Sequence, residues 1–560
     1  MEKDDKSDRS YSLPIKPVEN RGGNPKGERA EALEKAHIQQ DVDSLIAEME
    51  EQLIARGDKP GRFALSFKDP RHFTWFLVVF ASMGGLLSGL DQSLISGANL
   101  FLPKDLGLVG NQNSLVNSAM PLGAVAGSLL ISPANEFLGR RWAILISCIL
   151  YTIGGALCAG AIDFPMLIVA RLILGAGVGL EGGTVPVYVA ETVERRLRGN
   201  LVSLYQLMIA LGEVLGYAIG AMFINVPGNW RYILGSSLVF STIMLIGTLF
   251  IPESPRWLMH KGRDLDALKV WKRIRGTETR ESREEFYDMK ILLQMEELEI
   301  SEGRKKRFPW MDLFTNKRAR RALVFANIMI FLGQFTGINA VMYYMSVLMN
   351  QIGFDPVQSN YMSLVGGGAL LLGTIPAIFY MEVCGRRFWA LATLPGFFVG
   401  LVLVGVSYQI PIDNTVAVQG VYLTGLILYE GFFGCYACLT WVIPSEVYPT
   451  YLRSYGMTIS SAWVFLSSFI VTYNFTAMQN AMSRIGVTLG FFGGIAIFGW
   501  FYQLFFMYET KNKTLEEIDL IFERPTRDIV KENMRNSMAT IRDLGHGRFR
   551  KVATEVQPAW

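Results

Sequence analysis

Residues 73–97 read FTWFLVVFASMGGLLSGLDQSLISG, an apolar run that contains a single carboxylate, Asp91. About 20 predominantly apolar residues suffice for a helix to cross roughly 30 Å of hydrocarbon, so the run predicts a membrane span. A charge inside such a span costs roughly 2.5 to 3.5 kcal/mol on insertion-derived scales. We therefore expect Asp91 to have a functional role.

The composition of the whole chain is typical of a membrane protein. Half of the 560 residues are hydrophobic, only 18% are charged, and the mean hydropathy is +0.27. The net charge of +3 is too small to indicate a nucleic-acid partner. The predicted fold class is all-α and integral to the membrane, with twelve spans near residues 73–97, 113–133, 142–162, 165–186, 200–224, 231–251, 322–348, 360–381, 388–408, 418–442, 456–476 and 486–507.

Basic residues concentrate in alternate loops of this pattern, such as GRRW (139–142) and GRRF (385–388). By the positive-inside rule these loops and both termini are cytoplasmic. Amphipathic helices are expected within 28–57, 266–276 and 283–303. The chain then divides into a cytoplasmic N-terminal tail, a first six-helix bundle, a cytoplasmic helical linker, a second six-helix bundle and a cytoplasmic C-terminal tail: 1–72, 73–251, 252–321, 322–507 and 508–560.

The two halves of the chain repeat each other. EFLGRR at 136–141 returns as EVCGRR at 382–387, and ETVERRLRG at 191–199 returns as EVYPTYLRS at 446–454. An internal repeat of this size is typical of secondary transporters, whose substrate binds between the repeats near the middle of the bilayer. The sequence therefore predicts a duplicated carrier.

At these motifs the sequence resembles the sugar porter family of the major facilitator superfamily, and its loops are most similar to those of fungal members. The resemblance extends from Trp75 to Phe522 and rests on an ordered set of motifs: the two GRR sequences, R-x3-G-x-G-x-G (171–179), PVYVAE (186–191), PESPRWL (252–258), QFTGINAVMYY (334–344), WVIPSE (441–446) and ETKNKTLEEI (509–518). It implies a major facilitator fold and transport of a monosaccharide or polyol by alternating access.

Asp91 has a candidate partner in Arg171, the lone cation of the fourth predicted span. In proton-coupled members of the family an aspartate and an arginine in these positions form the coupling site, and the resemblance carries that role to Asp91 and Arg171. A carboxylate beside a fixed guanidinium changes its proton affinity when the partner moves. The alternative is a static salt bridge that holds two helices together.

Sugar recognition requires amides and hydroxyls around an aromatic surface. The resemblance implies that the substrate-binding residues are Gln206, Gln334, Asn339, Tyr343, Tyr344, Trp441 and Trp463. The alternative for any single amide is a hydrogen bond between neighbouring helices.

This sequence departs from the family pattern within that set. Gly333 stands where the family usually has a glutamine, and the span that contains Trp441 carries an additional acid, Glu430. Glu213, on the same helix face as Gln206, stands where some relatives have a sugar-binding glutamine. Glu213 and Glu430 are therefore added to the substrate-binding residues. We interpret Glu213 as a sign of an altered hydroxyl pattern, as a second proton-coupling group, or as a structural hydrogen-bonding group.

Charged residues at the cytoplasmic ends of the spans are interpreted as gates that pair when the inside is closed and separate when it opens. They are Glu136, Arg140, Arg141, Glu191, Arg198, Glu382, Arg386, Arg387, Glu446 and Arg453. Glu136 and Glu382 replace an aspartate that is more usual in the family. A solvated charged surface is the alternative.

Enzyme chemistry is not expected, because the chain has no lysine-containing phosphate loop, no HExxH and only four histidines. No cofactor or metal is predicted. The cysteine pair Cys435 and Cys438 lies in an apolar span and is interpreted as membrane packing rather than as a redox site.

The sequence thus predicts a plasma-membrane carrier for a hexose or polyol, driven by a proton gradient and functional as a monomer. Gly333 and Glu213 favour a polyol such as myo-inositol over glucose. A facilitator that moves no proton is the first alternative. A non-transporting sugar sensor is the second, and it is disfavoured because only about 50 residues follow the last predicted span.

Overall fold

The computed structural model of the chain describes residues 42–57, 70–193, 198–301, 309–411, 414–449, 452–511, 513, 518, 521–522 and 524–546. Within these ranges every regular element is helical. The chain falls into two compact units, each formed by two separate segments. The linker unit combines the segment up to Thr74 with Pro252–Arg304, and the transmembrane unit combines Trp75–Ile251 with Lys305–Trp560.

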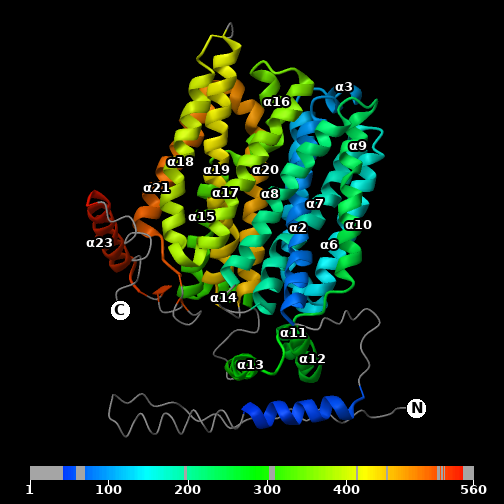
Figure 1. The fold of residues 1–560 in the computed structure, drawn as a ribbon, viewed down its shortest axis with the longest axis vertical. Helices are drawn as coiled ribbons and strands as arrows, with labels where there is room; N and C mark the ends of the chain where they lie inside the picture. Colours follow the sequence, from blue (N-terminus) through cyan, green and yellow to red (C-terminus); the bar gives the residue numbers. More distant parts are fainter. Residues whose placement is uncertain are drawn as a thin grey trace. The chain divides into compact units, whose positions relative to one another are not determined.

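The first half of the transmembrane unit consists of long apolar helices joined by short ones (Figure 1). They are α2 (Pro70–Ala98), α3 (Leu102–Asp105), α4 (Gln112–Leu129), α5 (Ile131–Pro133), η1 (Ala134–Leu138), α6 (Arg140–Ala159), α7 (Phe164–Thr192), α8 (Arg198–Phe223), α9 (Asn229–Gly235) and α10 (Ser237–Thr248).

The second half repeats this construction and adds a helix after the last span. Its helices are α14 (Pro309–Thr315), α15 (Lys317–Gln334), α16 (Ile338–Gln351), α17 (Pro356–Cys384), α18 (Arg386–Ser407), α19 (Thr415–Val447), α20 (Arg453–Ile485), η4 (Gly486–Gly493), α21 (Gly494–Phe506) and α23 (Thr526–Gly545).

The described helices account for the predicted spans. Ten are long and apolar enough to cross a membrane, and eleven if the bent pair Gln112–Leu129 and Ile131–Leu138 forms one span. The run Arg453–Phe506 has 54 residues, and at 1.5 Å per residue it is more than twice as long as the roughly 30 Å of hydrocarbon. Ser483, with φ of 65° and ψ of 163°, interrupts it between the predicted spans 456–476 and 486–507. This run therefore contains two spans.

The sequence repeat is also a repeat in space. In the first half α7 packs against α4 and α6, and in the second half α19 packs in the same way against α17 and α18. The halves meet where α8 packs against α17 and where α4 packs against α20. Each half therefore contributes equivalent helices to the contact between them.

Small residues bring α4 and α7 into close contact. A Cβ atom at Gly175 would lie 2.1 Å from the carbonyl oxygen of Met120, and one at Gly179 would lie 2.0 Å from that of Ala124. Glycines spaced four apart allow helices to approach this closely in a membrane. The contact fixes the part of α7 that carries Arg171, one turn before Gly175.

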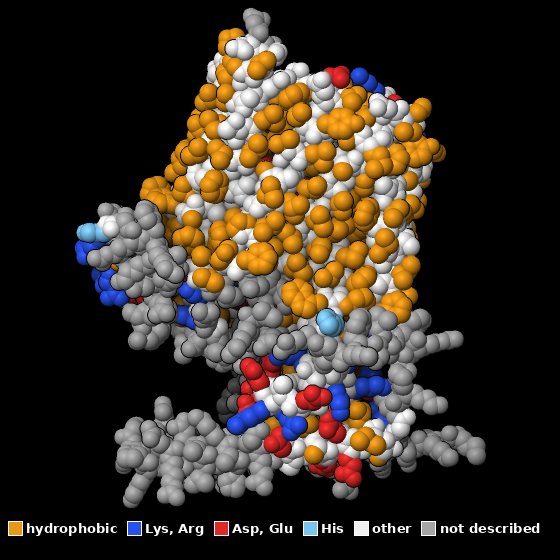
Figure 2. All heavy atoms as spheres, in the orientation of Figure 1, with side chains coloured by type: hydrophobic (Ala, Val, Ile, Leu, Met, Phe, Trp, Pro, Cys, Tyr) orange, Lys and Arg blue, Asp and Glu red, His pale blue; other side chains and the backbone are white. Residues whose placement is uncertain are grey.

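Apolar side chains cover the visible face of the transmembrane unit along the length of its helices (Figure 2). Large hydrophobic residues such as Trp142, Leu372, Phe379 and Phe498 are more than half exposed. Apolar surface of this extent matches a lipid environment.

The linker unit has a hydrophobic core of its own. A helix over residues 42–55 packs with α11 (Pro255–His260), α12 (Asp264–Ile274) and α13 (Arg280–Ser301). The core consists of Met49, Leu258, Met259, Ala267, Leu268, Trp271, Phe286 and Leu293. The helices α12 and α13 occupy the predicted segments 266–276 and 283–303, whereas the first part of the predicted segment 28–57 lies outside the described residues. The segments that the sequence separates into a tail and a linker thus fold together.

Candidate functional site

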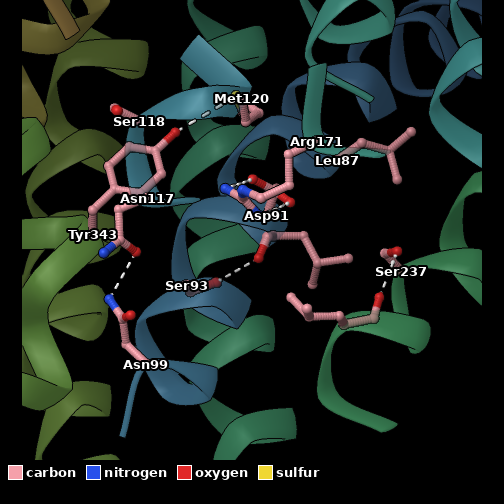
Figure 3. A network of polar contacts seen from close by, with 12 residues as sticks. Leu87, Asp91, Ser93, Asn99, Asn117, Ser118, Met120, Arg171, Ser237 and Tyr343 are labelled. Carbon is pink, nitrogen blue, oxygen red and sulfur yellow. Dashed lines mark hydrogen bonds and ion pairs between the residues drawn. The ribbon is translucent and has the colours of Figure 1, made fainter. Parts of the chain in front are cut away.

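Asp91 and Arg171 form a buried ion pair between α2 and α7 (Figure 3). Nη2 of Arg171 lies 3.0 Å from Oδ2 of Asp91, and Nη1 lies 3.3 Å from Oδ1. The side chain of Asp91 is 3% exposed and that of Arg171 is 0% exposed. The structure therefore brings together the two residues predicted to couple a proton, in the two-point geometry that arginine and carboxylate favour.

Because the pair is buried, each charge depends on the other for compensation. The Nε atom of Arg171 is buried and has no hydrogen-bond partner in the described chain. Removing one member of a buried pair leaves an uncompensated charge and typically costs 3 to 5 kcal/mol. Neutralisation of Asp91 would therefore leave Arg171 as an unpaired buried charge.

A break between α15 and α16 assembles the predicted amide groups. Gly337 has φ of 95°, a left-handed conformation that favours glycine, and it separates the two helices. The Nδ2 atom of Asn339 donates to Oε1 of Gln334 across the break, at 2.5 Å. From α16 the Tyr343 hydroxyl reaches the sulfur of Met120 on α4, at 3.5 Å (Figure 3). Discontinuous helices of this kind form substrate sites in transporters.

Gln206 and Trp441 meet across the two halves. The indole Nε1 of Trp441 on α19 donates to Oε1 of Gln206 on α8, at 3.1 Å. The ring of Tyr205 lies edge-on to that of Trp441, with centroids 5.0 Å apart. These residues combine an amide with an aromatic surface, as recognition of a hydroxylated ring requires.

Glu213 on α8 and Glu430 on α19 are buried, with 3% and 0% exposure. Oε2 of Glu213 and both carboxyl oxygens of Glu430 have no hydrogen-bond partner in the described chain. Both acids act electrostatically on the Tyr217 hydroxyl, which donates to the carbonyl oxygen of Met342 at 3.0 Å. Tyr217 is thus influenced electrostatically by one acid from each half.

The remaining predicted binding residues present unsatisfied polar atoms. The Tyr344 hydroxyl and the Trp463 Nε1 atom are buried and have no partner among the residues described. The ring of Tyr344 packs against Phe475, with centroids 5.3 Å apart. Buried polar atoms are usually hydrogen-bonded, so these two groups are exceptions within the described chain.

Tyr436 explains the glycine at position 333. A Cβ atom at Gly333 would lie only 2.8 Å from Cε1 of Tyr436. The Tyr436 hydroxyl accepts a hydrogen bond from Gln503 at 2.7 Å and donates to the carbonyl oxygen of Met329 at 3.3 Å. The tyrosine ring therefore occupies space that a side chain at position 333 would need.

Two of the predicted gate pairs form within the halves. Arg140 on α6 binds Glu191 on α7 at 2.7 and 3.0 Å. The equivalent Arg386 on α18 binds Glu446 on α19, which also accepts a hydrogen bond from Thr510 at 2.8 Å. Each pair connects helices of the same half.

A contact from the predicted gate set does cross between the halves. The Tyr455 hydroxyl on α20 donates to Oε2 of Glu136 in η1, at 2.7 Å. Arg141 donates to the carbonyl oxygen of Leu249. Among the other predicted gates, Arg387 binds backbone carbonyls of Leu504 and Asn533, Arg453 is buried at the start of α20, and the side chains of Arg198 and Glu382 lie outside the described part.

The structure adds polar residues that the sequence analysis did not single out. At the end of the transmembrane unit that carries α3 and α16 (Figure 1), Ser96 accepts a hydrogen bond from the backbone N–H of Ser346 at 3.0 Å. Ser346 also contacts Asn360 and Ser363 on α17. Serines are common in membrane helices, so no local signal distinguishes this contact between halves. Glu181 on α7 was also missed, although an acid in an apolar span is a recognisable signal.

The described residues contain no group of three or more histidine, cysteine or acidic side chains that could hold a metal ion. All five cysteines are free.

Comparison with known proteins identifies relatives along most of the chain. Residues 77–522 match the family model described as "Sugar (and other) transporter". The myo-inositol transporter FST1 of Gibberella moniliformis (strain M3125 / FGSC 7600) is 70% identical over 529 residues, which cover 94% of this chain and 92% of that protein. The arabinose-proton symporter of Escherichia coli (strain K12) is 31% identical over 462 residues, covering 81% and 94%.

Solved structures with the same fold come from the major facilitator superfamily. The proton:xylose symporter XylE of E. coli, bound to 6-bromo-6-deoxy-D-glucose, matches with a TM-score of 0.70 at 24% identity. The match covers 80% of this chain and 99% of that one. It shows the major facilitator fold, in agreement with the fold class predicted from the sequence.

Proposed function

The chain belongs to the sugar transporter family, and from that premise we propose that it carries myo-inositol, or a closely related polyol, across the plasma membrane together with a proton. Its family consists of transporters, not enzymes. The observation that carries the proposal is the buried Asp91–Arg171 pair, together with amides and aromatic rings that both halves contribute.

Two observations support a polyol. The first is the 70% identity to a protein named as a myo-inositol transporter. The second is the site itself, in which Tyr436 fills the space at Gly333 and the buried acid Glu213 lies on the same helix as Gln206. A fully hydroxylated ring offers a donor and an acceptor at every carbon, so it can use a carboxyl group as well as the amides of Gln206 and Asn339.

Proton coupling follows from the dependence of Asp91 and Arg171 on each other. When the site faces outward, a proton from water neutralises Asp91 and releases Arg171. Substrate binding and closure of the site then become favourable together. When the site faces inward, the proton leaves and the ion pair forms again. Glu213 and Glu430 provide further acids near the substrate groups.

Alternating access requires contacts that close each end in turn. Ser96 and Ser346 close one end with neutral hydrogen bonds, and Tyr455 and Glu136 join the halves at the other. The basic loops support a cytoplasmic location for the latter end and for both termini. The transport unit is one copy of the chain.

The test is uptake of labelled myo-inositol, xylose and glucose into transporter-deficient yeast, with external pH recorded during each addition. We expect myo-inositol to produce uptake and alkalinisation together. The Asp91→Asn variant should lose the alkalinisation and the accumulation against a gradient. The matched variant Gln206→Ala should raise the half-saturating concentration roughly tenfold or more, because one buried hydrogen-bonding group is lost, while the proton movement per substrate stays the same.

A facilitator, which moves its substrate without a proton, is the second candidate. It is favoured by the Asp91–Arg171 ion pair, because such a pair can also hold two helices together as a static contact. Under that function, uptake of the substrate would proceed without a pH change and would persist in the Asp91→Asn variant. A pH change with a different substrate and none with myo-inositol would retain the symporter and reject the polyol.

A further inference from the structure

Glu181 is a buried acid in the transmembrane unit that has no part in the ion pair or in the substrate site. It lies on α7 and is 2% exposed, and its Oε1 atom has no hydrogen-bond partner within the described residues. It is ten residues after Arg171 and ten residues before Glu191. At 1.5 Å per residue it stands about 15 Å from each along the helix, midway between the ion pair and the cytoplasmic end.

The packing around Glu181 reserves space for its carboxyl group. A Cβ atom at Gly84 on α2 would lie 0.8 Å from Oε1 of Glu181. Any side chain at position 84 would therefore displace the acid. Gly84 and Asp91 are seven residues apart and lie on the same face of α2, about two helical turns from each other.

Tyr151 on α6 contacts α2 between Gly84 and Asp91. Its hydroxyl donates to the carbonyl oxygen of Leu87 at 3.0 Å, and Leu87 falls between Gly84 and Asp91 on α2. Asp91, Arg171 and Glu181 all act electrostatically on this hydroxyl. A phenol can donate one proton and accept another, so it can connect two carboxyl groups that are too far apart to touch.

The charges around Glu181 differ from those around Asp91. The titratable groups facing it are Cys148 and Tyr151 on α6, Tyr205 on α8 and, beyond Tyr151, the Asp91–Arg171 pair. No cation of the described residues offsets the burial of Glu181. An unpaired ion buried there would cost several kcal/mol.

Opening of the cytoplasmic side would admit water. The residues after Glu181 pack against the second half: a Cβ atom at Gly182 would lie 3.3 Å from Phe465 and 3.5 Å from Trp441. Separation of the halves would expose the face of α7 at Gly182, the residue next to Glu181 in the chain.

We propose that Glu181 is the proton-release group of the transport cycle, located between Asp91 and the cytoplasm. In the inward-open state the O–H bond of Glu181 breaks and its proton passes to cytoplasmic water. The carboxylate then takes the proton of Asp91 through Tyr151 and the admitted water, and Asp91 becomes the anion that pairs with Arg171. No electron moves, and one proton leaves per cycle. The proposal rests on the proposed symport function.

The experiment compares two assays on purified protein in liposomes. Exchange of labelled for unlabelled myo-inositol needs no net proton movement, whereas uptake driven by a pH gradient does. For Glu181→Gln we expect exchange within about twofold of wild type and proton-driven uptake slowed roughly tenfold or more, since a positioned proton carrier contributes at least that much. Tyr151→Phe should show the same split. Cys148→Ala, which faces the same acid, should leave both assays unchanged.

Each other outcome identifies what fails. Wild-type rates of proton-driven uptake in Glu181→Gln would overturn the relay and leave the symporter intact. Loss of exchange together with uptake would assign Glu181 a structural role, which a fall in thermal stability would corroborate. Wild-type protein that moves substrate without protons would reject the symport function and the relay with it. Infrared difference spectra recorded after a pH jump give an independent test. If the relay operates, the wild type shows the band of a protonated carboxyl group and the Glu181→Gln variant lacks it.

Discussion

Gly333 and Tyr436 show how a single contact alters the substrate site. A glutamine at position 333 would place its Cβ atom 2.8 Å from the tyrosine ring. We therefore expect Gly333→Gln to lower the free energy of unfolding by about 1 to 3 kcal/mol, as overpacking does. Thermal unfolding of the purified protein measures the change. Gly368→Ala is the control, because a Cβ atom there meets nothing within 4 Å.

A second substitution separates this clash from other effects of glutamine. Adding Tyr436→Ala to Gly333→Gln removes the ring, so the double variant should be more stable than the sum of the two single changes predicts. Equal stability of Gly333→Gln and the wild type would contradict the close contact.

At the scale of residues, the sequence predicts those site members that carry an unusual group in an apolar span. Asp91, Arg171, Glu213 and Glu430 are recognisable in this way. The effect of Tyr436 on position 333 was not predictable, because it depends on the approach of two helices that are a hundred residues apart in the sequence. Glu181 was not predicted, although it is an acid in an apolar span, because no cation or matching motif in the sequence marks a partner for it.

The helix over residues 42–55 illustrates the scale of an element. Its carboxylate Glu50 accepts hydrogen bonds from Lys272 on α12 and from Thr277, both at 2.9 Å. The pKa of Glu50 lies below its ordinary value of about 4.5. The main cause is the hydrogen bond from Lys272, and the hydrogen bond from Thr277 also lowers it. The pair is partly exposed, so its contribution is under about 1 kcal/mol.

This shift predicts how docking of the helix depends on pH. Because the folded pKa is lowered, the contribution of Glu50 is fully present above its unfolded value and is lost as pH falls through the folded pKa, below about 4.5. Hydrogen exchange of residues 42–55 should accelerate over that window, after correction for intrinsic rates. The Glu50→Gln variant should exchange faster at neutral pH and show no such change. Identical profiles for both proteins would contradict the assignment.

Elements were predictable where the hydrophobic pattern is long and regular. The spans follow from apolar length alone, and α12 and α13 follow from their amphipathic pattern. The sequence predicts a break somewhere between residues 476 and 486 but not its position at Ser483, because a serine has no strong preference for a left-handed backbone. The docking of residues 42–55 was not predictable from local pattern, since its partners lie more than 200 residues away.

The whole molecule depends on contacts within each half and on fewer contacts between them. Glu446→Gln would leave Arg386, which is 3% exposed, without its carboxylate. We expect it to lower the unfolding free energy by on the order of 3 kcal/mol and to leave the balance of inward and outward states unchanged.

Tyr455→Phe removes a hydrogen bond between the halves, so it should shift the balance of inward and outward states by up to about tenfold with little loss of stability.

Thermal unfolding and distances between spin labels on α6 and α18 distinguish the two effects. A change in the distance distribution of Glu446→Gln equal to that of Tyr455→Phe would make Arg386–Glu446 a gate between the halves. At this scale the repeated motifs predicted the duplication, and the equivalent packing of α7 and α19 agrees with it. They did not predict which charges pair, because several basic residues stand within reach of each acid.

The core of the linker unit combines an early and a middle segment of the chain, so it can form only after both have been synthesised. Its core requires Met49 from the beginning of the chain and Phe286 and Leu293 from the middle. At 5 to 20 residues per second, the ribosome needs roughly 10 to 50 s to travel from residue 57 to residue 301. During that interval the first bundle enters the membrane while the helix over residues 42–55 exposes its apolar face without a partner. The nascent chain is therefore open to chaperones at its N-terminal end until the linker emerges.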